Sequence, residues 1–300
     1  MTINKINIFQ KVFNRTKNLR FSVMRIFARF IFFRKIHEFL QFQNPSEYRF
    51  NESIFKNLDI TAIVNELKIE GYSLGINLPT SYLNSILDYA KKSPCYGDFN
   101  YQQGFLYKDK ALIEKNNYSF MTSSYPNLIK NCSSIKAVSN DPQLFNIAKQ
   151  YLGFSPKLLN VQMWWVFPKE TDEIEKSLWA QKFHHDIDDY KFVKFFFYLT
   201  DVDIGSAPHS YVSRSHVNKK FRHQLSMKRI EDKDIYNDYG KEKVVSIYGK
   251  AGLGFVGDTY CLHKATVPIN KDRLLLQLEF GKNDYQKNNI ESTTNLSNIF

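Results

Sequence analysis

The chain has 300 residues, of which 43% are hydrophobic and 24% charged, a composition typical of a globular protein with a sizeable core. Its net charge of +11 is uneven: residues 1–40 carry nine basic residues and one acid, a net +8, which leaves +3 for the other 260. A nucleic-acid-binding domain places basic residues within its folded body. The charge distribution therefore argues against that class of partner.

Cysteine usage and hydropathy indicate a cytoplasmic protein. Cys95, Cys132 and Cys261 lie far apart and form no CxxC pair, so we expect no disulfide framework and a reducing compartment. The sequence contains no run of about 18 apolar residues, so we expect no transmembrane helix. The N-terminus also lacks the apolar region and small-residue cleavage site of a secretory signal.

Residues 1–45 have the pattern of a basic, amphipathic helical arm. Phe21, Met24, Phe30 and Phe33 recur on one broad apolar stripe, with arginines between them. We rank three roles for this arm. Packing against the domain comes first, peripheral contact with an anionic membrane surface second, and an organelle transit peptide third.

The next segment, about residues 55–160, is predicted to be rich in helix. Glu70–Gly75 has the pattern of a strand entering a turn. Pro79-Thr80-Ser81 opens an amphipathic helix that Pro94 ends, and Asn140-Asp141-Pro142 starts a second helix that ends at Gly153. Residues 95–135 are polar and irregular, so we expect mainly loops there.

From Leu158 onward the pattern changes to short β-branched or aromatic runs separated by turn residues. Such spacing without long intervening helices predicts an antiparallel sandwich or jelly roll, hence a mainly β fold with flanking helices. We assign residues 46–285 to this domain, expect Arg214–Asp238 to form a polar insert, and expect residues 286–300 to be a flexible tail. The predicted strands are Leu159–Phe167, Lys191–Leu199, Val244–Ile247, Leu253–Val256 and Leu274–Phe280.

Six of the seven histidines fall between residues 184 and 263, and three positions among them suggest a metal site. In an extended strand His184 and Asp186 point to one face and His185 to the other. His184, Asp186 and His263 together supply two imidazoles and one carboxylate. This ligand set leaves half of an iron's coordination sphere open. For the His184-x-Asp186 pair alone, an ordinary surface strand is the favoured alternative.

Arg273 is the fourth residue of this group. A hairpin through Pro268-Ile269-Asn270 is predicted to bring it back near His263. Its planar, permanently charged guanidinium matches a carboxylate, so it would suit a small dianion. The alternative is a salt bridge within the protein, for instance with Asp258 or Glu279.

Four segments together with Arg273 have a recognisable order and spacing: Gln181–Asp189, Phe195–Asp203, Pro208–His216 and Asp258–His263. On these segments, residues 60–282 resemble the phytanoyl-CoA dioxygenase family of Fe(II)/2-oxoglutarate-dependent oxygenases. The resemblance implies a double-stranded β-helix that holds Fe(II) through His184, Asp186 and His263, with Arg273 binding the far carboxylate of 2-oxoglutarate. It also implies that O2 is the cosubstrate and that an unactivated C–H of a small organic or lipid-like substrate is hydroxylated, with succinate and CO2 as coproducts.

The chain departs from the family pattern in two turns. It has Ser213-Arg214-Ser215-His216 where the family usually reads Pro-Gly-Ser-His, and Ser206-Ala207-Pro208 where the family usually reads Asn-Gly-Pro. These departures concern turn shape and substrate access. We interpret His209 and His216 as structural first and substrate-facing second.

Two other functional classes stay open at this point. One is a cupin-like metal enzyme that works without 2-oxoglutarate, and the other is a non-catalytic binding protein built on the same barrel. In every case a small molecule is the expected partner. An aspartate at position 186, where halogenases of the superfamily carry a small residue, favours hydroxylation.

Overall fold

The structure, a computed structural model, describes residues 19–41, 52–116, 118–168, 182–266, 268–285 and 295–299. Its α-helices are α2 (Leu19–Phe27), α3 (Ile31–Gln41), α4 (Ile60–Glu70), α5 (Thr80–Lys92), α6 (Lys110–Lys115), α7 (Leu128–Asn131), α8 (Ser133–Ser139), α9 (Pro142–Leu152), α11 (Phe221–Leu225) and α12 (Asp232–Tyr239). Its strands are β1 (Tyr72–Leu74), β2 (Cys95–Gly97), β3 (Gly104–Phe105), β4 (Thr122–Ser124), β5 (Lys157–Val166), β6 (Phe192–Tyr198), β7 (His209–Val212), β8 (Val244–Ile247), β9 (Gly254–Gly257), β10 (His263–Ala265) and β11 (Arg273–Gly281).

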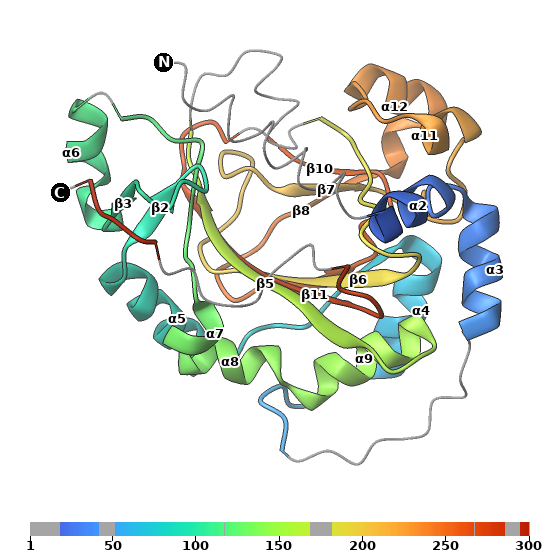
Figure 1. The fold of residues 1–300 in the computed structure, drawn as a ribbon, viewed down its shortest axis with the longest axis horizontal. Coiled ribbons are helices and arrows are strands. Elements are labelled where there is room, and N and C mark those ends of the chain that lie inside the picture. The colour runs from blue at the N-terminus through green and yellow to red at the C-terminus, as the bar shows by residue number, and fades with distance from the viewer. Residues whose placement is uncertain are drawn as a thin grey trace.

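The strands form two antiparallel sheets that face each other (Figure 1). The larger sheet has the order β1-β9-β6-β11-β5-β4-β2-β3, and the smaller has the order β10-β7-β8. After β5 the chain crosses repeatedly between them: β6 lies in the large sheet, β7 and β8 in the small one, β9 in the large, β10 in the small and β11 in the large. This alternation is that of a double-stranded β-helix, so the predicted jelly-roll core is confirmed.

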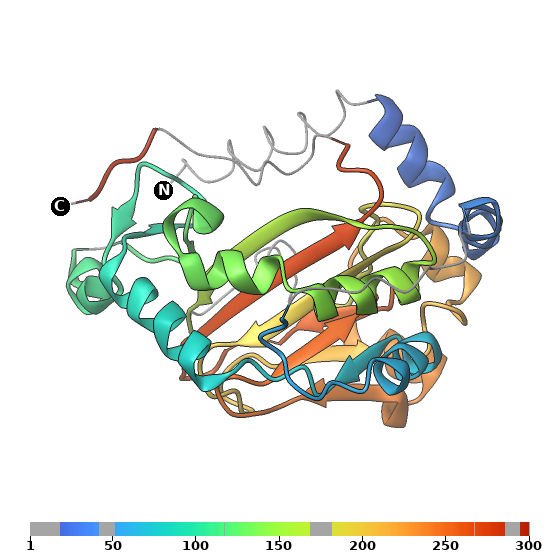
Figure 2. The same ribbon diagram turned by 90° about the horizontal axis from the view of Figure 1, so that it is seen from below.

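The two faces of the large sheet have different neighbours. Phe195 and Phe197 of β6 point into the core beneath the helices, whereas Phe196 and Tyr198 point toward the small sheet. This alternation follows from the two-residue period of a strand. Figure 2 shows α7, α8 and α9 lying across the outer face of the large sheet. The inner face is left to line the barrel, where the candidate site lies.

The two predicted helices are confirmed at their expected ends. The Asp141 carboxylate accepts hydrogen bonds from the backbone N–H groups of Gln143 and Leu144, which caps α9, and Gly153 ends it with a left-handed φ of 79°. The helix after Pro79 is α5.

Two expectations about the connections are wrong. Residues 95–135 contain helices and short strands as well as loops: α6 and α7 lie in this segment, β2 pairs with β4, and β4 pairs with β5. Strands of two or three residues are too short to show a periodic pattern. The predicted hairpin between His263 and Arg273 is also wrong, since β10 pairs with β7 and β11 pairs with β5 and β6.

Helices α2 and α3 pack beside the barrel (Figure 1). Phe21 and Met24 are buried against Ile187, and the Arg34 guanidinium lies 3.8 Å from the centroid of the Tyr260 ring. The arm positions 1–18 and 42–45 lie outside the described residues. No helix in the described part of the chain is long and apolar enough to cross a membrane.

Candidate active site

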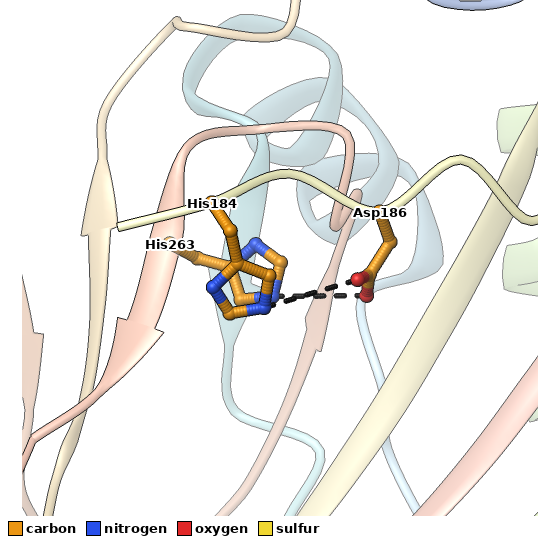
Figure 3. A group of neighbouring side chains, drawn as sticks. All are labelled: His184, Asp186 and His263. Carbon is orange, nitrogen blue, oxygen red and sulfur yellow. Dashed lines mark ion pairs between the residues drawn. The ribbon is translucent and has the colours of Figure 1, made fainter. Parts of the chain in front are cut away.

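Three side chains from two segments converge inside the barrel: His184, Asp186 and His263 (Figure 3). One potential ligand atom from each lies within 4.8 Å of the other two. A backbone ladder holds the segments together, because His184 and His263 exchange N–H···O bonds of 2.9 and 2.8 Å. The distances from the carboxylate of Asp186 to the Nε2 atoms of His184 and His263 are 3.9 and 3.7 Å. A single metal ion can bridge donors at these separations.

Backbone carbonyls orient both imidazoles in the same way. His184 Nδ1 lies 3.1 Å from the carbonyl oxygen of Lys182, and His263 Nδ1 lies 2.9 Å from that of Cys261. A carbonyl can only accept, so each Nδ1 carries the proton and each Nε2 presents a lone pair toward Asp186. This is the arrangement of histidines that bind metals through Nε2.

The protonation states also suit a metal. Burial, together with the neighbouring imidazole of His263, holds the pKa of His184 well below its usual value, and burial lowers the pKa of His263. Burial alone would raise the pKa of Asp186, but the Lys194 ammonium and the two imidazoles hold it well below its usual value. At neutral pH the donors are therefore two neutral imidazoles and one carboxylate, which fit a divalent cation.

Lys194 is a residue of this site that the sequence reasoning missed. Its Nζ donates to Asp186 Oδ2 at 2.8 Å and to Asp188 Oδ2 at 2.9 Å, and it lies 3.8 Å from Glu279 Oε2. Burial lowers the pKa of Lys194, but these three acids raise it well above its usual value. The available signal was a single lysine within the otherwise apolar run Phe192–Tyr198.

Arg273 lies deeper in the barrel, with 1% of its surface exposed. Its guanidinium donates to the carbonyl of Ala207 and lies 3.4 Å from His209 Nδ1, while its Nε has no partner. Burial lowers the pKa of Arg273 to about 10. None of the described acids pairs with it, so the alternative of a salt bridge with Asp258 or Glu279 is not seen. Asp258 is instead bonded to Tyr151 and to the backbone of Tyr260.

Of the four remaining histidines of the cluster, His223 pairs with Asp238 in the insert, and the other three separate into two groups. His209 packs against Phe196 and beside Arg273, so it faces the barrel interior. His185 faces Tyr260, with ring centroids 5.4 Å apart, and His216 contacts Cys261 and the carbonyl of Lys68. His185 and His216 are therefore held in structural contacts away from the three converging side chains.

The two departures from the family turns coincide with unusual backbone geometry. Ala207 has φ 57° and Arg214 has φ 64°, a left-handed conformation that favours glycine. Ala207 stands where the family pattern has glycine, and its carbonyl is the one that accepts from Arg273. The unusual turn thus contributes directly to the position of the buried guanidinium.

Comparisons with known proteins give likenesses of fold only. No family model matches the chain, and no curated protein matches it. Among solved structures, the non-heme alpha ketoglutarate dependent epimerase SnoN from nogalamycin biosynthesis is 12% identical, with a TM-score of 0.49 over 74% of this chain and 82% of that one. HygX from Streptomyces hygroscopicus, with nickel, 2-oxoglutarate and hygromycin B bound, is 14% identical, with a TM-score of 0.48 over 74% of this chain and 86% of that one.

Proposed function

We propose that the protein is an Fe(II)- and 2-oxoglutarate-dependent oxygenase of the superfamily to which the phytanoyl-CoA dioxygenases belong. The observation that carries the proposal is the joint placement of two Nε2 lone pairs, one carboxylate and an unmatched buried guanidinium in one barrel. In this proposal His184, Asp186 and His263 hold the metal. Arg273 binds the far carboxylate of 2-oxoglutarate.

When bound, Fe(II), 2-oxoglutarate and O2 supply the oxidation of an unactivated substrate C–H, with succinate and CO2 as coproducts. The residues of the chain do the remaining work. The carbonyls of Lys182 and Cys261 keep the imidazoles oriented, and Lys194 fixes the Asp186 carboxylate. The aromatic wall of Phe196, Tyr211 and Phe255 excludes water beneath the centre.

The unmatched guanidinium separates this function from its alternatives. A buried arginine without an acidic partner is costly, and a dianionic cosubstrate removes that cost. A 2-oxoglutarate-independent cupin-like enzyme or a non-catalytic metal-binding protein has no use for this cation. The structure thus gives a physical reason to prefer the oxygenase.

The test is an anaerobic titration. Fe(II) and then 2-oxoglutarate are added to the purified protein, and the weak visible charge-transfer band of the chelate is recorded. We expect the band in the native protein, its loss in His263→Ala, and succinate release when air is admitted. Iron binding without the band would favour the metal protein that does not use 2-oxoglutarate, and the absence of iron binding would contradict both.

For the N-terminal arm we propose peripheral contact with a membrane in addition to the packing seen for α2 and α3. The outer face of α3 exposes Phe32, Phe39 and Leu40 by 66, 82 and 70%. The exposed Lys35 lies on the same helix, and the exposed Arg20 lies on α2. An apolar face with flanking cations suits an anionic lipid surface. The divisions at residues 45 and 285 and the cytoplasmic location stay predictions.

A further inference from the structure

We propose that Asn160, Gln162 and Gln277 form a subsite for an uncharged, hydroxyl-rich ring of the substrate, such as a sugar unit. The inference rests on the proposed oxygenase function and names the class of its substrate. It arises from three amides on the inner face of the large sheet that make no side-chain hydrogen bond with any residue that the structure describes.

The alternation of side chains places these amides inside the barrel. On β11, Leu274, Leu276 and Leu278 belong to the core beneath the helices, whereas Arg273 and Leu275 face the small sheet. Gln277 continues this inner row. On β5, Met163 and Trp165 belong to the outer core and Trp164 packs toward the inner cluster, so Asn160 and Gln162 also point inward.

The strand register connects the amides to the candidate metal centre. Gln162 lies opposite Gln277, which lies opposite Phe196 of β6. One step along the same strands, Asn160 lies opposite Glu279, which lies opposite Lys194, the residue bonded to Asp186. Adjacent strands are about 4.8 Å apart, so β5 lies about 10 Å across the sheet from β6.

Two of the three amides, Asn160 and Gln277, are buried, and Gln162 is half-buried. Asn160 and Gln277 are 7% and 8% exposed, and neither they nor Gln162 make a side-chain hydrogen bond with any residue that the structure describes. Ser124, on the neighbouring strand β4, adds a buried hydroxyl oxygen without a partner. The Ser124 oxygen is buried without a hydrogen bond to any described residue, which is costly, and a ligand hydroxyl that bonds to it removes that cost.

A small cavity lies at this position. It has a volume of about 90 Å³. Its lining includes Asn160, Gln162, Ser124 and Trp164, and also Leu128 and Ile129 of α7. Gln277 lies between this cavity and the centre, as the register shows. No acidic or basic side chain is among the described residues that line it. The cavity therefore favours an uncharged ligand.

The chemistry of the lining selects among uncharged ligands. A neutral amide offers both donors and an acceptor, and a hydroxyl needs both. Aromatic side chains add apolar faces on which the C–H face of a ring can rest. A fatty acyl chain would bury the amides without partners. The subsite thus fits a polyhydroxylated ring and disfavours the lipid-like substrate.

The test uses ligand-observed saturation-transfer NMR on the full chain loaded with Zn(II) and 2-oxoglutarate. The probes are methyl β-D-glucopyranoside, methyl β-D-galactopyranoside and octanoate. We expect ring-proton signals from at least one glycoside, weakened about fivefold in Gln162→Met and in Asn160→Leu, because each substitution removes hydrogen bonds of about 1 kcal/mol. The matched control is Gln150→Met on α9, which lies outside the cavity and should leave the signals unchanged.

Two results would overturn the subsite. One is the absence of ring signals from both glycosides, and the other is signals of equal strength in the native protein and both cavity variants. The 2-oxoglutarate affinity, measured on the same samples by calorimetry, should be equal in all of them. Failed 2-oxoglutarate binding in the native protein would count against the oxygenase proposal, whereas intact binding without glycoside signals would count against the subsite alone.

Discussion

Two buried cations, Arg273 and Lys194, divide the tasks of the site at the scale of single residues. Lys194 is surrounded by three acids, so its charge is balanced within the protein. Among the residues that the structure describes, the Arg273 guanidinium makes hydrogen bonds only with a carbonyl and an imidazole. Lys194 therefore orients Asp186, a proposed ligand of the metal, whereas Arg273 has a charge that an anionic ligand can neutralise.

Replacing Arg273 by glutamine should separate cosubstrate binding from metal binding. Removing a charge-assisted bond to a carboxylate costs about 1.5–3 kcal/mol, so we expect the dissociation constant of 2-oxoglutarate to rise about 10- to 100-fold. Fe(II) affinity should be unchanged, as measured by anaerobic titration. The control is Arg222→Gln, a surface arginine paired with Asp238. Equal 2-oxoglutarate affinity in both variants would assign the anchor to another residue.

Replacing Lys194 by methionine should destabilise the metal-free protein strongly. The change leaves Asp186, Asp188 and Glu279 without their shared cation, and breaking a buried ion pair from one side costs about 3–5 kcal/mol. A bound divalent metal supplies positive charge at Asp186, so Zn(II) should raise the melting temperature of the variant more than that of the native protein. Calorimetry with and without Zn(II) checks both points. An unchanged melting temperature without metal would show that Lys194 is dispensable for balancing the acids.

At the scale of elements, α2 and α3 have two apolar faces. The inner face is tied to the barrel by Arg34, whose guanidinium stacks on Tyr260 and donates to the carbonyl of Asp189. The Lys191 ammonium pairs with Glu38. The sequence showed the apolar stripe but not which residues it would meet, because Tyr260 is more than 200 positions away.

Arg34→Met should therefore destabilise the whole domain. A desolvated cation–π contact is worth about 2 kcal/mol, and the bond to Asp189 adds to it. We expect a melting temperature several degrees lower, with Lys35→Met, an exposed neighbour, as the control. If the two variants have the same melting temperature, the contacts of Arg34 contribute nothing measurable to stability.

The outer face of α3 leads to a different prediction. Phe39→Asp should weaken binding to vesicles of phosphatidylcholine with one-third phosphatidylserine by about tenfold, since inserting a Phe ring is worth about 1.5–3 kcal/mol. Co-sedimentation measures the bound fraction. Ile204→Asp, which changes an apolar residue exposed by 74% elsewhere, is the control. If the native protein stays in the supernatant, it does not bind the vesicles, and the membrane proposal is contradicted.

At the scale of the molecule, the sequence was informative where patterns are long. Runs such as Phe192–Tyr198 and Arg273–Gly281 showed the barrel strands, and the spacing of His184 and Asp186 showed a shared face. The pairing of strands was not predictable, because the same alternation fits a neighbour in either sheet. The roles of Lys194 and the three inner amides could not be predicted for a similar reason. They depend on which face of each strand points into the barrel, and only the structure assigns those faces.

Buried histidines should make the stability of the metal-free protein depend on pH. Burial, with Arg273 adding to it at His209, holds the pKa of His209 well below its usual value, and burial lowers the pKa of His216. Below the unfolded pKa of about 6.5, the unfolded chain takes up protons that the folded chain refuses, so stability is present above that pH and lost below it. Asp186, with its lowered pKa, and Lys194, with its raised one, keep their charges between pH 5.5 and 7.5 and do not contribute there.

Each histidine that stays neutral in the folded state should lower the free energy of unfolding by about 1.4 kcal/mol between pH 7.5 and pH 5.5. Urea denaturation in the presence of a chelator measures this change. His209→Gln should reduce this pH dependence by the contribution of one histidine, because glutamine does not titrate. The control is Gln150→Met on α9, which changes no ionisable group. A native unfolding free energy that is constant across this interval would mean that the histidines are protonated inside the fold, and that the barrel interior is wetter than its packing indicates.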